Sequence, residues 1–228
     1  MNEQVKSKKR VANYGEVFTS KREVNAMLDL VKQETQRIDS RFLEPACGTG
    51  NFLTEILERK LRVVEKRYKR NQIEFEKYSI LAVSSIYGIE IQRDNVKECR
   101  MKLFGIFDWK YTELYPKTTK NECRNSVKFL FSKNIIHGNA LSLQTEDNPP
   151  KPITFSEWSL VNGSMIKRRD FTMSLLINSY QSAQMDLFPE PDLFADFDEE
   201  EFVPKPTKEY PLQHFLKLGE ENDRKLQS

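Results

Sequence analysis

The residues with the clearest chemical meaning lie in one short turn. Residues 41–53 read Arg-Phe-Leu-Glu-Pro-Ala-Cys-Gly-Thr-Gly-Asn-Phe-Leu, so an apolar strand start runs into Glu44, a proline and two glycines. Gly48 and Gly50 permit a sharp turn and a close approach of the backbone to a ligand, because neither carries a Cβ atom. The amphipathic helix that follows presents free N–H groups and the positive end of its dipole. This pattern predicts a nucleotide-type site at the end of a first parallel strand.

The spacing of the glycines narrows the class of ligand. It is neither G-x-x-x-x-G-K-[ST] nor G-x-G-x-x-G, and no lysine follows the second glycine, so a triphosphate cradle is not expected. Glu90 closes the apolar run 86–91 and is the second candidate for this site. A carboxylate at a strand tip suits a ribose diol because it accepts two hydrogen bonds. The alternative reading of Glu90 is an incidental charge at the end of a strand.

Alternating strands and helices would place these residues together. Apolar residues at helical spacing predict helices over about 20–31, 52–70, 73–83 and 96–107. Apolar or β-branched runs predict strands at Phe42 and over 86–91, 133–141 and 153–161. The alternation indicates an α/β fold with a doubly wound, mostly parallel, Rossmann-like sheet.

The turn resembles the first motif of the class I S-adenosylmethionine-dependent methyltransferases. Residues 42–53 match, almost letter for letter, the form found in DNA adenine-N6 methyltransferases of restriction-modification systems. The resemblance implies that S-adenosyl-L-methionine is the cofactor and that Glu44, Ala46, Gly48 and Gly50 bind it.

Two further segments resemble motifs of the same family. Residues 15–20 are similar to G-x-[FY]-[FYV]-T-[PS], which implies that Thr19 binds the methionine carboxylate, although a plain helix cap is the alternative. Residues 138–141 are similar to Gly-Asp-Ala-Leu, whose Asp accepts a hydrogen bond from the adenine amine of the cofactor. Asn139 stands at that position and keeps an acceptor oxygen without the charge.

The catalytic motif departs from the family pattern. Adenine-N6 enzymes carry [DNS]-P-P-[YFW] after the fourth strand, where an amide or carboxylate oxygen and a backbone carbonyl hold a flipped-out base. The equivalent place here retains Asn162, followed by Gly163, but lacks both prolines and the aromatic ring. These two residues are the catalytic candidates. Residues 148–151, Asn-Pro-Pro-Lys, imitate the motif but precede the strand and are interpreted as a loop.

The resemblance covers residues 15–171, the cofactor-binding half of such an enzyme. Its later strands and its target-recognition domain have no recognisable counterpart, so we expect an incomplete sheet. Two functions remain open. One is a DNA methyltransferase in a restriction-modification or phage-defence context. The other is a catalytically incomplete, cofactor-binding subunit or degenerate paralogue that needs a partner chain for target recognition; methylation of RNA or protein is a weaker third option.

Charge is divided unevenly along the chain. Residues 1–175 carry 31 Lys and Arg against 22 Asp and Glu, whereas residues 176–228 carry 5 against 12. A basic body suits DNA as partner, and Lys167, Arg168 and Arg169 are candidates for phosphate contact or a solvated loop. In the acidic tail, Gln184, Leu187 and Phe188 lie in a peptide that resembles the sliding-clamp docking motif Q-L-[SD]-L-F; a solubilising tail is the alternative.

Composition also predicts compartment and organisation. Three cysteines without regular spacing indicate reduced thiols and a cytoplasmic location, with no metal site. No apolar run is long enough for a membrane span, and the N-terminus lacks a signal-peptide core. We expect a flexible basic arm over 1–13, the methyltransferase-like domain over 14–178, and a largely disordered acidic tail over 179–228. One short docking helix is expected around Phe215 within that tail.

Overall fold

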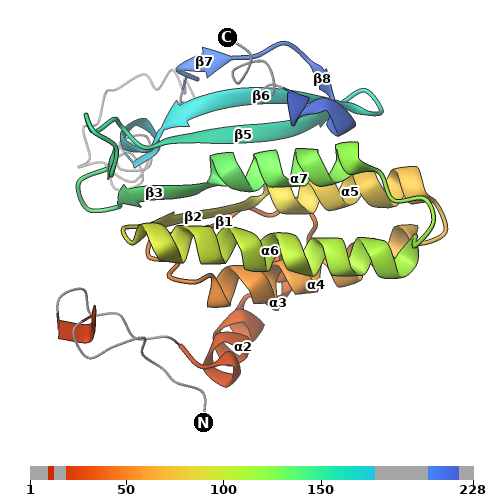
Figure 1. Cartoon of the computed structure of the whole chain (residues 1–228), viewed down its shortest axis with the longest axis horizontal. Helices are drawn as coiled ribbons and strands as arrows, with labels where there is room; N and C mark the ends of the chain where they lie inside the picture. Colours follow the sequence, from red (N-terminus) through yellow and green to blue (C-terminus); the bar gives the residue numbers. More distant parts are fainter. Residues whose placement is uncertain (1–9, 13–18, 178–204, 221–228) are drawn as a thin grey trace, which may run out of the picture.

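The computed structural model describes residues 10–12, 19–177 and 205–220. Its first sheet contains β1 (Phe42–Glu44), β2 (Ile86–Glu90) and β3 (Ile135–Asn139) as parallel neighbours, with the short antiparallel β4 (Gln144–Thr145) on the outer side of β3. Every residue of the central strand β2 is buried, which explains its continuous apolar character. The α/β class and the mostly parallel sheet are confirmed (Figure 1).

Helices connect and cover these strands. In chain order they are α2 (Lys21–Leu30), α3 (Lys32–Thr35), α4 (Asn51–Tyr68), α5 (Gln72–Ser84), α6 (Arg93–Leu114) and α7 (Asn121–Asn134). The helices α4 and α6 pack together on one side of the sheet, and α5 packs with α7 on the other (Figure 1). The strands are therefore covered on both faces, as expected for a doubly wound arrangement.

The predicted fourth strand does not continue this sheet, so that expectation was wrong. Strand β5 (Thr154–Val161) pairs antiparallel with β6 (Met165–Thr172) in a second sheet, which lies over α5 and α7 (Figure 1). Between them the chain reverses at Asn162 and Gly163, which both have positive φ, 45° and 75°. Asn-Gly is a strong hairpin signal because both residue types tolerate the left-handed region.

Helix α7 has no counterpart in the sequence prediction. It begins without a side-chain cap, and Lys120 rather than Ser, Thr, Asp or Asn occupies the N-cap position. Its last residue, Asn134, lies buried where α7 runs directly into β3. The Asn134 amide donates to the carbonyls of Ser84 and Ile86 and accepts from the Trp158 indole, so it links α5, β2 and β5. Trp158 is therefore a core residue.

The C-terminal segment 205–220 belongs to the folded body, which corrects its assignment to a disordered tail. Strands β7 (Lys208–Glu209) and β8 (Gln213–His214) both pair with β6. The expected docking helix is a single 3₁₀ turn, η1 (Phe215–Lys217), that packs on α7. Phe215 is 0% exposed and Leu218 is 1% exposed, so this turn completes the main core.

Two smaller observations concern the ends and the membrane. Near the N-terminus, where a flexible arm was expected, Arg10 forms an ion pair with Asp94 at 2.6 Å. None of the helices in the described part of the chain is both long enough and apolar enough to span a bilayer.

Candidate functional site

The glycine turn lies at the carboxyl edge of the parallel strands. After β1 the chain is held by a hydrogen bond from Cys47 N–H to the carbonyl of Ile89, and Gly50 N–H donates back to the Cys47 carbonyl at 2.8 Å. Gly48 and Gly50 have φ of 52° and 89°, and Gly50 is the N-cap of α4. A Cβ on Gly50 would stand 2.7 Å from the Cys99 sulfur. Both positions therefore require glycine for conformation, and Gly50 also requires it for space.

Glu90 meets this turn directly. Gly48 N–H donates to Glu90 Oε2 at 2.9 Å, across 42 residues of sequence. The other carboxylate oxygen accepts from Gln92 N–H at 2.8 Å and from the Asn95 amide at 3.4 Å, at the start of α6. The carboxylate at the tip of β2 therefore fixes the glycine turn against the next helix, and its Oε2 atom can still accept another hydrogen bond.

Glu44 supplies a second carboxylate at the same edge. It ends β1 beside Gly88 of β2, and it is half-buried. Burial raises the pKa of this carboxyl, and a hydrogen bond from Ala46 N–H only partly offsets the effect. Neither Glu44 nor Glu90 forms an ion pair with any residue that the structure describes, so the edge offers negative charge to a cationic ligand.

Thr19 is brought to the turn from the N-terminal side. Its carbonyl accepts a hydrogen bond from the Asn51 amide at 3.1 Å, and the Thr49 hydroxyl donates to the oxygen of the same amide at 3.4 Å. Asn51, the first residue of α4, therefore links the segment around Thr19 to the glycine turn.

Asn139 lies at the end of β3, two residues beyond the position that pairs with Glu90. Its side-chain oxygen accepts from the N–H groups of Leu141 at 2.9 Å and Ser142 at 3.4 Å, which shapes its own loop. The side-chain oxygen of Asn139 is thus already used to stabilise a turn, as is common for Asn. A role of Asn139 in ligand binding stays a prediction.

The structure thus gathers seven of the predicted residues at one edge: Thr19, Glu44, Ala46, Gly48, Gly50, Glu90 and Asn139. The sequence reading missed the residues that hold them, namely Asn51, Gln92 and Asn95. It also missed Gly88, where a Cβ would lie 2.9 Å from both the Cys47 sulfur and a Leu53 methyl. A glycine inside an otherwise buried strand was the available signal, because it marks a close approach of another group.

Asn162 and Gly163 lie elsewhere. Along β5 the contacts move from the carboxyl edge, where Ile153 N–H bonds the Leu143 carbonyl, to Trp158, which bonds Asn134 at the opposite end of β3. The hairpin turn follows beyond that point and is exposed. The catalytic candidates are consequently not brought together with the cofactor candidates, because the expected parallel strand is one arm of a hairpin.

The basic cluster on β6 is internally paired. Arg168 is buried, bonds both carboxylate oxygens of Asp170 at 3.0 Å, and stacks on the Tyr210 ring with its central carbon 4.0 Å from the ring centre. Lys167 pairs with Glu209 and Arg169 with Glu157, each at 2.8 Å. These three residues join the second sheet together, which accounts for them without a phosphate backbone.

The proposed docking peptide cannot be placed. Gln184, Leu187 and Phe188 lie outside the described residues, so the interaction with a sliding clamp stays a prediction.

A protein-family model matches more than half of the chain. The family model described as MmeI, DNA-methyltransferase domain, matches residues 18–160, which run from the segment before α2 almost to the end of β5. No curated protein and no solved structure matches the chain significantly.

Proposed function

The chain belongs to the MmeI DNA-methyltransferase domain family, and from this premise we propose that it uses S-adenosyl-L-methionine to methylate adenine at N6 in DNA. The family places it with DNA methyltransferases of restriction-modification systems. The adenine-N6 assignment rests on the resemblance of residues 42–53 to that class of enzyme. The observation that best supports the choice of cofactor is the 2.9 Å hydrogen bond from Gly48 N–H to Glu90, which joins the glycine turn to a carboxylate at the tip of a strand.

The donor set at this edge fits the proposed cofactor. S-adenosyl-L-methionine has an ammonium group, a sulfonium centre, a carboxylate and a ribose diol. Two carboxylates without ion-pair partners among the described residues suit its positive groups and its diol. We assign Glu90 to the ribose hydroxyls, Glu44 to the positive amino-acid end, Thr19 to the methionine carboxylate and Asn139 to the adenine amine.

The chemistry requires mainly positioning. When bound, the cofactor supplies a methyl group on a sulfonium, which is a good leaving group. The backbone at Ala46, Gly48 and Gly50 would orient it, because the left-handed turn lets main-chain atoms approach without side-chain interference. Fixed orientation converts a bimolecular methyl transfer into an effectively unimolecular one, which accounts for most of the rate that such a site needs to supply.

A second candidate function is a cofactor-binding subunit that methylates DNA only together with a partner. The observation that favours it is the position of Asn162 and Gly163 at the end of the sheet opposite to Gly48 and Glu90. In that case a partner chain would contribute the groups that hold the target base. A cytoplasmic location agrees with either function.

One experiment separates these functions. Purified chain is incubated with tritiated S-adenosyl-L-methionine and unmethylated DNA, the DNA is digested to nucleosides, and label in the deoxynucleoside N6-methyldeoxyadenosine is measured. Cofactor binding is measured in parallel by calorimetry. Label in that nucleoside supports the enzyme, and binding without transfer supports the subunit.

Variants make the result specific. Glu90→Gln should weaken cofactor binding and any methyl transfer together, whereas Asn162→Ala should leave both unchanged. Absence of cofactor binding by the folded wild-type chain would reject both functions. Loss of transfer in Asn162→Ala with binding intact would instead restore Asn162 as a catalytic residue.

A further inference from the structure

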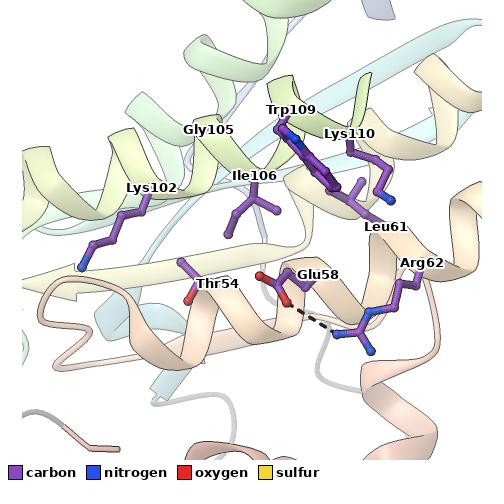
Figure 2. Close-up of a pocket in the computed structure, with 9 residues that line it drawn as sticks. All are labelled: Thr54, Glu58, Leu61, Arg62, Lys102, Gly105, Ile106, Trp109 and Lys110. Carbon is purple, nitrogen blue, oxygen red and sulfur yellow. Dashed lines mark hydrogen bonds and ion pairs between the residues drawn. The ribbon is translucent and has the colours of Figure 1, made fainter. Parts of the chain in front are cut away.

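The end of helix α4 carries a dense group of positive charges. Four cations lie within five residues, and all of them are exposed: Lys66, Arg67, Lys69 and Arg70. None of the four forms an ion pair with any residue that the structure describes. Earlier on the same helix the cations are paired, since Arg59 contacts Asp29 at 2.8 Å and Arg62 contacts Glu58 (Figure 2). The unpaired charges therefore begin where the helix ends.

The loop from α6 to α7 brings a fifth cation, Lys117, to the same corner. The Tyr115 hydroxyl donates to the Lys69 carbonyl at 3.0 Å, and the Gln72 amide donates to the Thr118 carbonyl at 2.7 Å. Lys117 lies between these two loop residues, is exposed, and has no ion-pair partner in the described part of the chain. Neutral groups thus hold the corner together, which leaves its charges available.

These five cations, here called the corner patch, are not neutralised by neighbouring carboxylates. The carboxylates of the same segments pair with other cations: Glu65 and Glu113 with Lys110, Glu74 with Lys77, and Glu76 with Lys120. Residues 65–77 and 110–120 hold eight Lys and Arg against four Asp and Glu, so the corner has a net charge of +4. A surface of this kind attracts polyanions.

The dipole of α4 accounts for only part of this charge. Cations in the last turn of a helix are favourable, which covers Lys66 and Arg67. Lys69, Arg70 and Lys117 lie outside the helix. Like charges this close together repel one another, and an anion from outside would remove that repulsion.

The shape of the patch favours an extended anion. Its side chains are exposed on two neighbouring turns, so they can contact a row of charges but cannot enclose a small ligand. Duplex DNA offers such a row, with one negative charge per about 1.7 Å of its axis.

We propose that the corner patch binds the phosphate backbone of duplex DNA, independently of base sequence. The choice of DNA as the anion rests on the proposed function. Phosphate neutralisation supplies essentially all of the affinity in such binding. The cofactor edge is a poor source of it because Glu44 and Glu90 make that edge negative. The cations of β6 are a poor source as well, because they are paired within the second sheet.

Helix α4 separates the patch from the reacting groups. The helix begins at the glycine turn and runs for 18 residues, a length of about 27 Å. In Figure 1 the strands β2 and β3 point to the left, toward the cofactor edge, and the loop from α6 to α7 lies at the right. The patch should therefore set the affinity for DNA without affecting the affinity for the cofactor.

Fluorescence anisotropy tests this role. A fluorescein-labelled DNA duplex is titrated with the full chain at several NaCl concentrations. Five phosphate contacts predict that log Kd rises with log salt concentration with a slope of about 4. The variant that combines Lys66→Gln, Arg67→Gln, Lys69→Gln and Arg70→Gln should bind at least tenfold more weakly at low salt. Its slope should fall to about 1, because one phosphate contact remains.

The control variant removes the same amount of charge elsewhere. It combines four exposed positions on α3, α7 and the C-terminal segment: Lys32→Gln, Lys128→Gln, Lys205→Gln and Lys217→Gln. This variant should keep the affinity and the salt slope of the wild-type chain. Circular dichroism and calorimetric binding of S-adenosyl-L-methionine verify that both variants are folded, and neither variant should change the cofactor Kd.

Four results would overturn the proposal. They are no binding of the duplex by the wild-type chain, equal DNA affinity of the wild-type chain and the patch variant, and equal loss in the two variants. The fourth is displacement of the DNA by poly-L-glutamate at equal charge concentration, which would assign the patch to an acidic protein surface.

The proposed function is judged separately. Binding of DNA through the patch without methyl transfer would leave this proposal standing and reject the enzyme. Methyl transfer by a patch variant with unchanged DNA affinity would reject the patch and leave the enzyme standing.

Discussion

At the scale of single residues, the candidate site is defined by backbone conformation and by two carboxylates. Gly48 and Gly50 could be predicted from the sequence, because a paired glycine turn between an apolar strand and an amphipathic helix has few other uses. The supports of Glu90 could not, since Gln92 and Asn95 become its neighbours only when α6 turns back at the end of β2.

The ionisation of Glu44 gives the first prediction. Burial raises its pKa, so it loses its charge at a higher pH than an ordinary glutamate as the solution is acidified. If Glu44 binds the positive amino-acid end of the cofactor, affinity for S-adenosyl-L-methionine should fall as pH is lowered through the mildly acidic range. Calorimetry at several pH values measures this. The Glu44→Gln variant should bind more weakly and show little of this dependence; an identical pH profile in both proteins would contradict the assignment.

A buried lysine, Lys60, gives the second prediction. Lys60 is fully buried and donates to the carbonyls of Ile38 and Ser40 and to the Ser85 hydroxyl. Burial lowers its pKa from 10.5 to about 7. Between these values the unfolded chain holds a proton that the folded chain lacks, so the free energy of unfolding should rise with pH above 7, by up to about 1.4 kcal/mol per unit.

Urea denaturation at pH 7, 8 and 9 checks this contribution. The Lys60→Met variant, which cannot titrate there, is the comparison, and the difference between the two proteins isolates Lys60. A difference that stays constant over this range would show that the ammonium remains charged in the folded state.

At the scale of elements, most strands and helices could be predicted from the sequence, but the pairing of β5 with β6 in a second sheet could not. Strands β1, β2 and β3 follow from apolar runs that end in polar residues, and α4 and α5 follow from their helical spacing. Strand β5 is present as expected, but an alternating apolar pattern does not specify which strand it pairs with. The Asn-Gly turn reverses the chain and makes β6 its partner. Helix α7 was not predicted because its N-terminus has no capping side chain to mark it.

The same substitution, glycine to alanine, should change the free energy of unfolding in opposite directions in the β5–β6 hairpin and in helix α6. Gly163→Ala forces an alanine to a φ of 75° and should lower the free energy of unfolding by about 1 kcal/mol. Gly105→Ala, in an uncrowded helix, should raise it by about 0.5–1 kcal/mol. Thermal unfolding of dilute protein measures both. The same sign in the two variants would mean that one of these backbone conformations is wrong.

At the scale of the whole molecule, two sheets share the helices α5 and α7, and a segment distant in sequence closes them. Phe215 reaches the main core from beyond residues 178–204, and β7 and β8 extend the second sheet along β6. The change in composition after residue 176 hid this return, because average acidity says nothing about a few apolar residues further along.

The closing segment predicts a large loss of stability from one side chain. Phe215→Ala removes a fully buried ring from the contact with α7 and should lower the free energy of unfolding by about 3–5 kcal/mol. Leu212→Ala, at a largely exposed position three residues earlier, is the control and should cost little. Denaturant titration compares the two, and equal effects would contradict the packing of η1.

This late closure also has a consequence for synthesis on the ribosome. All strands and helices of the cofactor edge have been synthesised once translation reaches Asn139. The core that supports them is completed only when Phe215 and Leu218 have left the exit tunnel. Since chains elongate at about 5–20 residues per second, the emerging chain spends several seconds with the surface of α7 uncovered. Stalled chains that end before residue 205 should therefore be more sensitive to protease than chains released after residue 220.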